Sequence, residues 1–133
     1  MELSEARARF AAARVARLAT VSADGMPHLV PVTFAVDGDT VVIAVDHKPK
    51  RTTDLKRLRN IAAQPRVSLL ADHYDEDWDQ LWWVRADGRA RVADTGPVDL
   101  LVAKYPQYTG RPPAGPVIVV EIELWRGWAA SGG

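Results

Sequence analysis

The sequence predicts a mainly β protein, a six-stranded antiparallel barrel with few and short peripheral helices. Three β-rich runs follow one another in "RLATVSADGMPHLVPVTFAVDGDTVVIAVD", at residues 17–22, 28–36 and 40–46. The segments "ADGMP" and "DGD" between these runs are typical of tight hairpin turns. Near the C-terminus, "VIVVEI" is an almost continuous apolar run that suits a buried strand. Antiparallel strands with short helices favour a closed or split barrel over a doubly wound parallel sheet.

The remaining elements follow from capping and turn residues. Ser4 can cap a helix over residues 4–15, with Glu5 in its first turn. Thr52 or Thr53 can cap a second helix that runs to about residue 64, where Pro65 helps to end it. Strands are predicted at residues 66–71, 81–93 and 117–125, and a short helix at residues 97–105. The segment "DHYDEDWD" is predicted to be a solvated acidic connection, because it lacks the spacing and the glycine of a calcium loop.

Composition restricts the class of protein. The 133 residues fit a single domain, residues 1–133, and 47% of them are hydrophobic and 26% charged. A formal net charge of zero argues against nucleic acid as the main partner. The chain has no cysteine, which excludes disulfides and thiolate chemistry. No apolar run approaches the ~20 residues of a membrane span, so we expect a cytoplasmic protein with no membrane partner.

Positive charge is concentrated in one segment, "HKPKRTTDLKRLRN" at residues 47–60, which holds six of the seventeen Lys and Arg residues. On a helix that starts near Thr53, Lys56 and Asn60 stack on one face, while Leu55, Leu58 and Ile61 face the core. Basic side chains and free backbone N–H groups would then meet at a helix N-terminus, which suits a phosphate or a polycarboxylate. The alternative is a solvated helix face that the acidic segment balances.

Other candidate residues carry weaker signals. The three histidines, His28, His47 and His73, lie far apart in the sequence without a ligand-like spacing, so no metal site is predicted. Trp78, Trp82 and Trp83 form an aromatic cluster beside the acidic segment. Aromatic residues on strands usually pack in cores or interfaces, so we expect Trp82 and Trp83 to pack and Trp78 to be available for stacking.

These patterns together resemble a known superfamily. The hairpin run quoted above, the segment "KPKRTTDLKRLRNIAAQPRVSLL" and the segment "WWVRADGRARV" are similar to the pyridoxamine 5′-phosphate oxidase-like split β-barrels, the FMN-binding split-barrel type. With the ending "EIELWRGWAA", they more narrowly resemble an actinobacterial branch of oxidoreductases that depend on the deazaflavin coenzyme F420. The resemblance extends from Phe10 to Trp128.

The resemblance implies a homodimer with two equivalent cofactor sites at the subunit interface. Carried over by position, the basic segment would hold the cofactor's phosphate and acidic tail. Those residues are Lys50, Arg51, Thr52, Thr53, Lys56, Arg57 and Asn60. The backbone of Pro31, Val32, Thr33 and Phe34 would flank the ring, and Trp78 would close over it, from the other subunit. No catalytic side chain is implied, because the cofactor's ring carries the hydride.

The resemblance also implies a reaction: hydride transfer between F420 and an unsaturated small molecule. The dense basic cluster favours F420 over FMN, because F420 carries a phosphate and an oligoglutamate tail, whereas FMN carries one phosphate. The chain lacks the long N-terminal arm and the arginine-rich close of true pyridoxamine phosphate oxidases, which argues against oxidation of vitamin B6. Two alternatives stay open: an FMN-binding flavoprotein, and a non-catalytic carrier of F420 or flavin.

Overall fold

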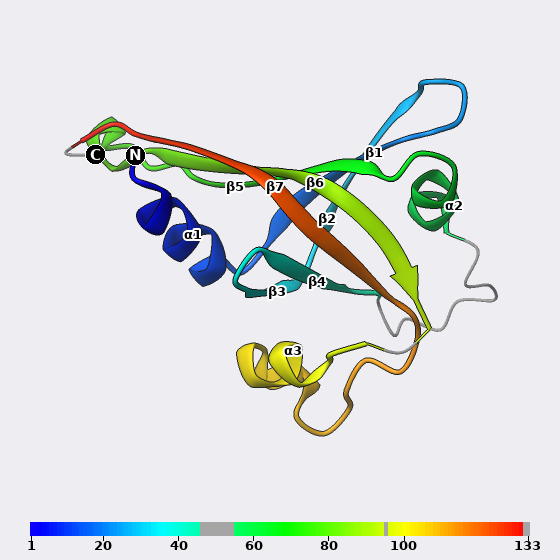
Figure 1. Cartoon of the computed structure of the whole chain (residues 1–133). Helices are drawn as coiled ribbons and strands as arrows, with labels where there is room; N and C mark the ends of the chain where they lie inside the picture. Colours follow the sequence, from blue (N-terminus) through cyan, green and yellow to red (C-terminus); the bar gives the residue numbers. More distant parts are fainter. Residues whose placement is uncertain (46–54, 95, 132–133) are drawn as a thin grey trace.

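A curled antiparallel sheet forms the body of the molecule (Figure 1). The structure is a computed structural model, and it describes residues 1–45, 55–94 and 96–131. The sheet order is β2-β1-β5-β6-β7-β4-β3. Its strands are β1 (Ala16–Val21), β2 (Pro27–Val32), β3 (Phe34–Asp37), β4 (Thr40–Ala44), β5 (Arg66–His73), β6 (Trp82–Ala93) and β7 (Val117–Ala129). The helices are α1 (Leu3–Ala12), α2 (Lys56–Ala63) and α3 (Asp99–Lys104), with short 3₁₀ turns η1 (Trp78–Gln80) and η2 (Pro106–Tyr108).

The two edge strands of the sheet, β2 and β3, are separated in sequence only by Thr33. The prediction of six strands is therefore wrong by one, because residues 28–36 form two strands. Val32 pairs with Ala16 of β1, whereas Phe34 pairs with Ile43 of β4. A continuous β-rich run does not reveal that the chain changes its pairing partner within it. The change lets one segment contribute to both edges of the sheet, as a split barrel requires.

Turn and bulge residues explain how the sheet is shaped. Gly25 and Gly38 have φ angles of +89° and +61° in the β1–β2 and β3–β4 turns, so both predicted hairpins are confirmed. The β6–β7 ladder has a register shift between Asp87 and Gly88. A Cβ at Gly88 would lie 2.1 Å from the carbonyl oxygen of Glu121. Glycine is thus required where β6 bends closely against β7.

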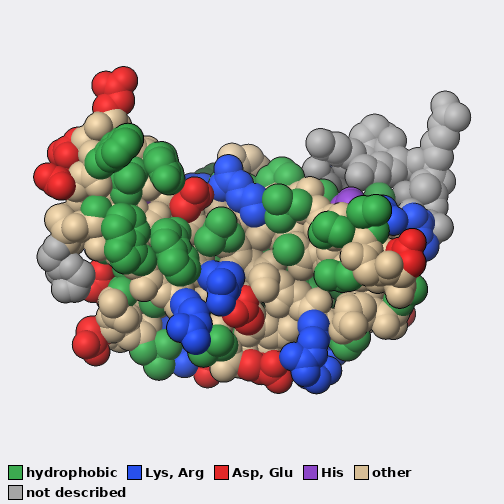
Figure 2. All heavy atoms as spheres, turned by 90° about the horizontal axis from the view of Figure 1, so that it is seen from above, with side chains coloured by type: hydrophobic (Ala, Val, Ile, Leu, Met, Phe, Trp, Pro, Cys, Tyr) green, Lys and Arg blue, Asp and Glu red, His purple; other side chains and the backbone are tan. Residues whose placement is uncertain are grey.

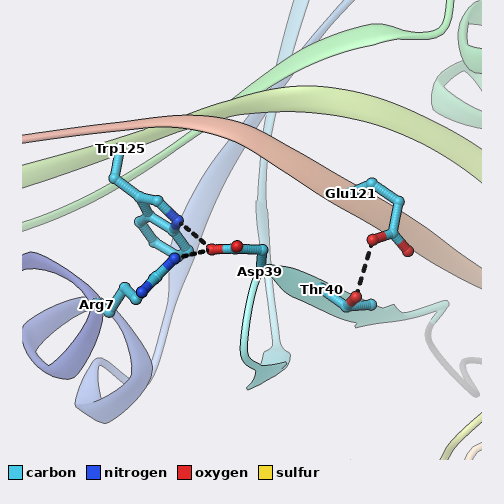
Figure 3. Close-up of polar contacts among 5 residues, drawn as sticks. All are labelled: Arg7, Asp39, Thr40, Glu121 and Trp125. Carbon is cyan, nitrogen blue, oxygen red and sulfur yellow. Dashed lines mark hydrogen bonds and ion pairs between the residues drawn. The ribbon is translucent and has the colours of Figure 1, made fainter. Parts of the chain in front are cut away.

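Helix α1 packs against β7 and β6, and a contact with the β3–β4 turn holds it there. Phe10 is fully buried, with its ring 4.8 Å from that of Phe34 and 5.4 Å from that of Trp125. Arg7 and Trp125 both donate hydrogen bonds to the Asp39 carboxylate (Figure 3), and the indole N–H does so at 3.0 Å. Those hydrogen bonds, from Trp125 first and then Arg7, lower the pKa of Asp39. Three distant segments, α1, the turn and β7, therefore meet at one carboxylate.

Both longer helices have other bounds than predicted: α1 spans Leu3–Ala12 instead of residues 4–15, and α2 spans Lys56–Ala63. Glu2 is the N-cap of α1 and makes no side-chain cap, so Ser4 lies within the helix instead of capping it. Leu55, with φ −87° and ψ 146°, is the N-cap of α2, so this helix begins at Lys56 and not at Thr53. The Leu55 side chain packs against the core, and its extended backbone delays the start of the helix to Lys56. The predicted end of α2 before Pro65 is confirmed.

A second apolar cluster lies outside the barrel, between the β3–β4–β7 part of the sheet and α3. Leu101 and Tyr105 are buried against Val42, Val117 and Val119. The Tyr105 hydroxyl accepts a hydrogen bond from the Phe34 N–H at 3.1 Å, and it lies 3.0 Å from the Phe34 carbonyl oxygen. These contacts attach α3 to the sheet beside the β2–β3 junction.

Candidate functional site

The start of α2 presents positive charge to solvent. Lys56 is exposed at the first helical position, and the first turn contains no acidic residue. Leu55 supplies no side-chain cap, and the first N–H groups of a helix have no acceptor within the helix. The pKa of Asp24, in the β1–β2 turn, is lowered mainly by a hydrogen bond from Ser22 and to a smaller extent by the charge of Lys56. The helix start therefore lies near that turn, whose Asp24 carboxylate offsets part of the charge of Lys56. The unused N–H groups of the first turn and the Lys56 ammonium favour an anion at this end of α2.

Asn60 is buried and contacts the sheet, instead of facing solvent beside Lys56. Its side chain is 4% exposed, and Nδ2 donates a hydrogen bond of 3.0 Å to Oγ1 of Thr20, which is buried too. This bond ties α2 to β1. Asn60 belongs to the predicted tail site, but a direct contact with a ligand would require it to leave the core. Arg57 is half-buried on the same helix. Lys50, Arg51, Thr52 and Thr53 lie outside the described residues.

The β2–β3 junction holds the residues predicted to flank a ring. Pro31 is exposed on the edge strand β2, where the missing N–H of proline is tolerated. Val32 and Phe34 are buried in the barrel core. The backbone N–H and C=O of Phe34 already meet the Tyr105 hydroxyl, so a ring bound there would compete with Tyr105. Thr33 is the member of this group whose side chain reaches a cavity.

That cavity, of about 610 Å³, lies between the β2–β3 junction, the segment after α1 and the η2 turn. Its lining residues are Arg14, Thr33, Tyr105, Pro106, Gln107 and Tyr108. Oγ1 of Thr33 lies 2.8 Å from the Tyr108 hydroxyl, and the rings of Tyr105 and Tyr108 are 5.8 Å apart at 72°. This volume is in the range of small-molecule sites. We name it the junction cavity.

Sequence reasoning did not identify the junction cavity. The sequence predicts Tyr105 at the end of a helix and no element at residues 106–108, although the pattern "YPQY", with two tyrosines close together, is a usable signal of an aromatic wall. Arg14 carries no sequence signal, because it belongs to a string of arginines in the N-terminal region. Only the packing of α3 and η2 against the sheet brings these residues to Thr33.

Lys104 lies next to the junction cavity, behind Tyr105. Its Nζ atom is buried without a hydrogen-bond partner, 3.7 Å from the centre of the Phe34 ring and 5.2 Å from that of Tyr105. Burial, and then the nearby charge of Arg14, lower the pKa of Lys104 to about 8. Burial also raises the pKa of Tyr105, which keeps its hydroxyl neutral.

Trp78 lies at the opposite end of β5 from α2. Helix α2 leads into the start of β5, whereas η1 follows its end (Figure 1). An eight-residue strand spans roughly 25 Å, and the Trp78 side chain is 72% exposed. One chain therefore does not bring Trp78 to α2. Trp82 packs on the core cluster with the Arg9 guanidinium 5.6 Å from its ring, and Trp83 pairs with Trp128 across β6 and β7.

One side of the sheet faces outward and is broad and only partly polar. It is formed by the strands β2, β1, β5, β6 and β7. We define this outer face by two cross-strand rows, Leu29–Ala19–Ser68–Asp87–Leu124 and Pro31–Arg17–Leu70–Arg85–Arg126. Leu29 is 67% exposed, and Leu70 and Leu124 are exposed too. Figure 2 shows hydrophobic side chains at both ends of the molecule from above, with Lys and Arg between them. Two hollows, of about 340 and 380 Å³, lie on this face.

Among the described residues, no three His, Asp or Glu side chains are placed to hold a metal ion. No helix in the same part of the chain is long and apolar enough to span a membrane.

The curled antiparallel sheet, whose two edge strands β2 and β3 follow one another in the chain, defines a protein of the split-barrel class. A model of the family "Pyridoxamine 5'-phosphate oxidase" matches residues 3–129. The chain therefore belongs to the pyridoxamine 5′-phosphate oxidase family.

Solved structures with the same fold come from several bacteria. A conserved hypothetical protein of Mycobacterium tuberculosis, Rv2991, is 21% identical with a TM-score of 0.78, over 98% of this chain and 86% of that one. An FAD binding protein of Mycobacterium smegmatis is 21% identical with a TM-score of 0.65, over 96% and 94%. A heme binding protein of the same species is 22% identical with a TM-score of 0.72, over 97% and 54%. At these identities the likeness establishes the fold alone. No curated protein matches the chain.

Proposed function

We propose that this protein is an oxidoreductase that uses coenzyme F420 and transfers a hydride between it and an unsaturated small molecule. The observation that carries the proposal is the positively charged start of α2 on a split-barrel fold. Lys56 is exposed there, no acidic residue shares the first turn, and helix N–H groups add to the positive potential. A multiply charged tail gains more from such a site than a single phosphate does, which favours F420 over FMN.

The residues present fit an anionic cofactor tail by their chemistry. Lys56 supplies a charge-assisted donor, and the side chains of Lys50, Arg51, Thr52 and Thr53 would extend the same site. The deazaflavin, when bound, supplies the hydride. The protein's part is to bind, to orient and to exclude water. Thr33 lies at the edge of the junction cavity, which would give a substrate room beside the ring.

We further propose that the working unit is a homodimer formed through the outer face. Exposed Leu29, Leu70 and Leu124 alternate there with charges of both signs, such as Arg17 and Asp72, which form an ion pair of 3.5 Å. A two-fold arrangement would let such rows meet copies of themselves. It would also offer Trp78 of one copy to a ring held by the other, because one chain places Trp78 and α2 at opposite ends of β5.

The experiment that tests the function is a side-by-side titration of the purified protein with F420 and FMN at low ionic strength. We expect tighter binding of F420. Oxidation of reduced F420 in the presence of α,β-unsaturated acceptors then separates an enzyme from a carrier. An FAD binding protein with this fold supports the flavoprotein alternative. Tighter binding of FMN or FAD would select that alternative, and F420 binding without turnover of any acceptor would select a carrier.

A further inference from the structure

The junction cavity combines two tyrosine rings in its lining with a volume of about 610 Å³. Tyr105 and Tyr108 meet edge to face at 72°, and Pro106 lies between them in the sequence. A planar ring packs well against such a surface, because aromatic groups favour edge-to-face and offset contacts. Thr33, Gln107 and the Tyr108 hydroxyl add polar groups at the rim. The shape suits a small aromatic molecule.

The cavity also has positive charge that no carboxylate balances. Arg14 lines it and donates one hydrogen bond, of 2.8 Å, to the carbonyl oxygen of Lys104. A guanidinium has five N–H donors, so further donors remain for a ligand. Lys104 lies just behind, with its ammonium buried and without a hydrogen-bond partner. Among the described residues, no Asp or Glu lies within ion-pair distance of Arg14 or Lys104.

The Arg14 side chain is exposed to solvent, whereas the ammonium of Lys104 is buried beside it without a counter-charge. Burying an ammonium without a partner opposes folding, and the two like charges repel each other. Cation–π contacts with Phe34 for Lys104, and with Tyr105 for Arg14 at 5.9 Å, offset only part of this cost. A bound anion would offset more of it, because Arg14 can hold a carboxylate in a bidentate manner.

From these contacts we propose that the junction cavity binds a small aromatic carboxylate. The carboxylate meets the Arg14 guanidinium, the ring packs on Tyr105 and Tyr108, and Lys104 strengthens the positive potential from behind without touching the ligand. The inference deepens the proposed function and rests on it for the role of substrate, because Thr33 belongs both to the predicted ring-binding strand and to this cavity. It thus names the class of substrate: an unsaturated aromatic carboxylate.

The test uses cinnamate and its neutral isostere cinnamamide as probes, with isothermal titration of the full chain. Wild type should bind cinnamate more tightly than cinnamamide. Arg14→Gln should weaken cinnamate about tenfold or more, the loss expected for a charge-assisted contact, and leave cinnamamide nearly unchanged. Arg111→Gln removes a charge from the loop after η2 that does not line the cavity, so it should change neither probe.

The cinnamamide measurement is the control for folding, because a variant in which the cavity is unfolded would bind neither probe. In that event Arg14→Lys, which keeps the charge but not the fork, should show an intermediate loss for cinnamate alone. Equal affinities of wild type for cinnamate and cinnamamide would overturn the proposal, and so would an equal effect of Arg14→Gln and Arg111→Gln.

Titration of the same proteins with F420 separates the two proposals. If cinnamate binds through Arg14 while F420 does not bind, the carboxylate site stands and the F420 function fails. If F420 binds to wild type and to Arg14→Gln alike while cinnamate shows no preference over cinnamamide, the function stands and the carboxylate site fails.

Discussion

Lys56 carries its charge at the first position of α2, where the helix dipole and the unused N–H groups add to it. Its side chain points away from the stripe of Leu55, Leu58 and Ile61 that packs on the core. We therefore expect Lys56→Ala to leave the fold intact and to raise the dissociation constant of F420 by about one to two orders of magnitude. The affinity for FMN should fall less than the affinity for F420. Fluorescence titration with both cofactors measures the difference.

Lys56→Arg is the matched control, because it keeps the charge at the same position and should retain most of the affinity. The effect of Lys56→Ala should shrink at high salt, since screening weakens the wild-type contact as well. If Lys56→Ala binds F420 as tightly as wild type at low salt, Lys56 is a solvated surface residue and no part of the site.

The buried ammonium of Lys104 should make the free energy of unfolding depend on pH. Burial lowers its pKa in the folded protein to about 8, from 10.5 for a free lysine. Between these values the unfolded chain binds more protons than the folded one, so the contribution of Lys104 to the free energy of unfolding rises with pH. Below the folded pKa, the buried ammonium opposes folding in full. Arg14, Tyr105 and Tyr108 are the other ionisable groups around it.

Lys104→Met keeps an apolar stem over Phe34 and removes the charge. We expect this variant to be more stable than wild type near neutral pH, with the difference shrinking as pH approaches about 10, where wild-type Lys104 is mostly neutral when folded. Urea unfolding at a series of pH values measures this. A pH-independent difference would mean that the ammonium is solvated in the folded protein.

At the scale of elements, a buried hydrogen bond joins α2 to the sheet. The amide of Asn60 donates to Thr20 of β1, and both side chains are buried. Thr20→Val keeps the shape of the side chain but leaves that amide without its acceptor, so the free energy of unfolding should fall by about 1–3 kcal/mol. Denaturant unfolding gives the value, and Thr40→Val, which removes the exposed hydrogen bond to Glu121 (Figure 3), should cost clearly less.

Asn60 was assigned from the sequence to a ligand site, because it lies four residues after Lys56 on a helix with a basic start. Its hydrogen bond to Thr20 depends on the position of β1 beside α2, which helical periodicity does not contain. A similar cost for Thr20→Val and Thr40→Val would show that Asn60 finds another acceptor, and would favour its predicted role as a ligand residue.

At the scale of the whole molecule, the proposal of a homodimer through the outer face can be tested by measuring the mass in solution. A homodimer through it should give a mass near twice 14.6 kDa by light scattering at micromolar concentration. Leu29→Asp places a charge on the most exposed leucine of this face and should shift the protein toward monomer without lowering its helix and strand content. Leu100→Asp, on α3 and away from this face, is the control.

Monomeric Leu29→Asp should also bind F420 more weakly if Trp78 from a second copy closes the site. A wild-type chain that stays monomeric would remove the two-copy site, and F420 affinity that is unchanged in a monomeric variant would confine the site to one chain.

The sequence by itself determined the local structure and the class of fold. The glycines of "ADGMP" and "DGD" require the turns, alternating and continuous apolar runs require strands, and Pro65 ends α2, because these are effects of backbone conformation and of side-chain period. Those effects act over a few residues, so they can be predicted from a short stretch of chain.

Tertiary structure decided which of those elements contact one another. The change of pairing partner at Thr33, the inward turn of Asn60 and the separation of Trp78 from α2 depend on which strands lie side by side. The junction cavity is the clearest case, since Arg14, Thr33 and Tyr108 come from three distant segments. Contacts between residues far apart in sequence are set by packing of the whole core, and no local pattern records them.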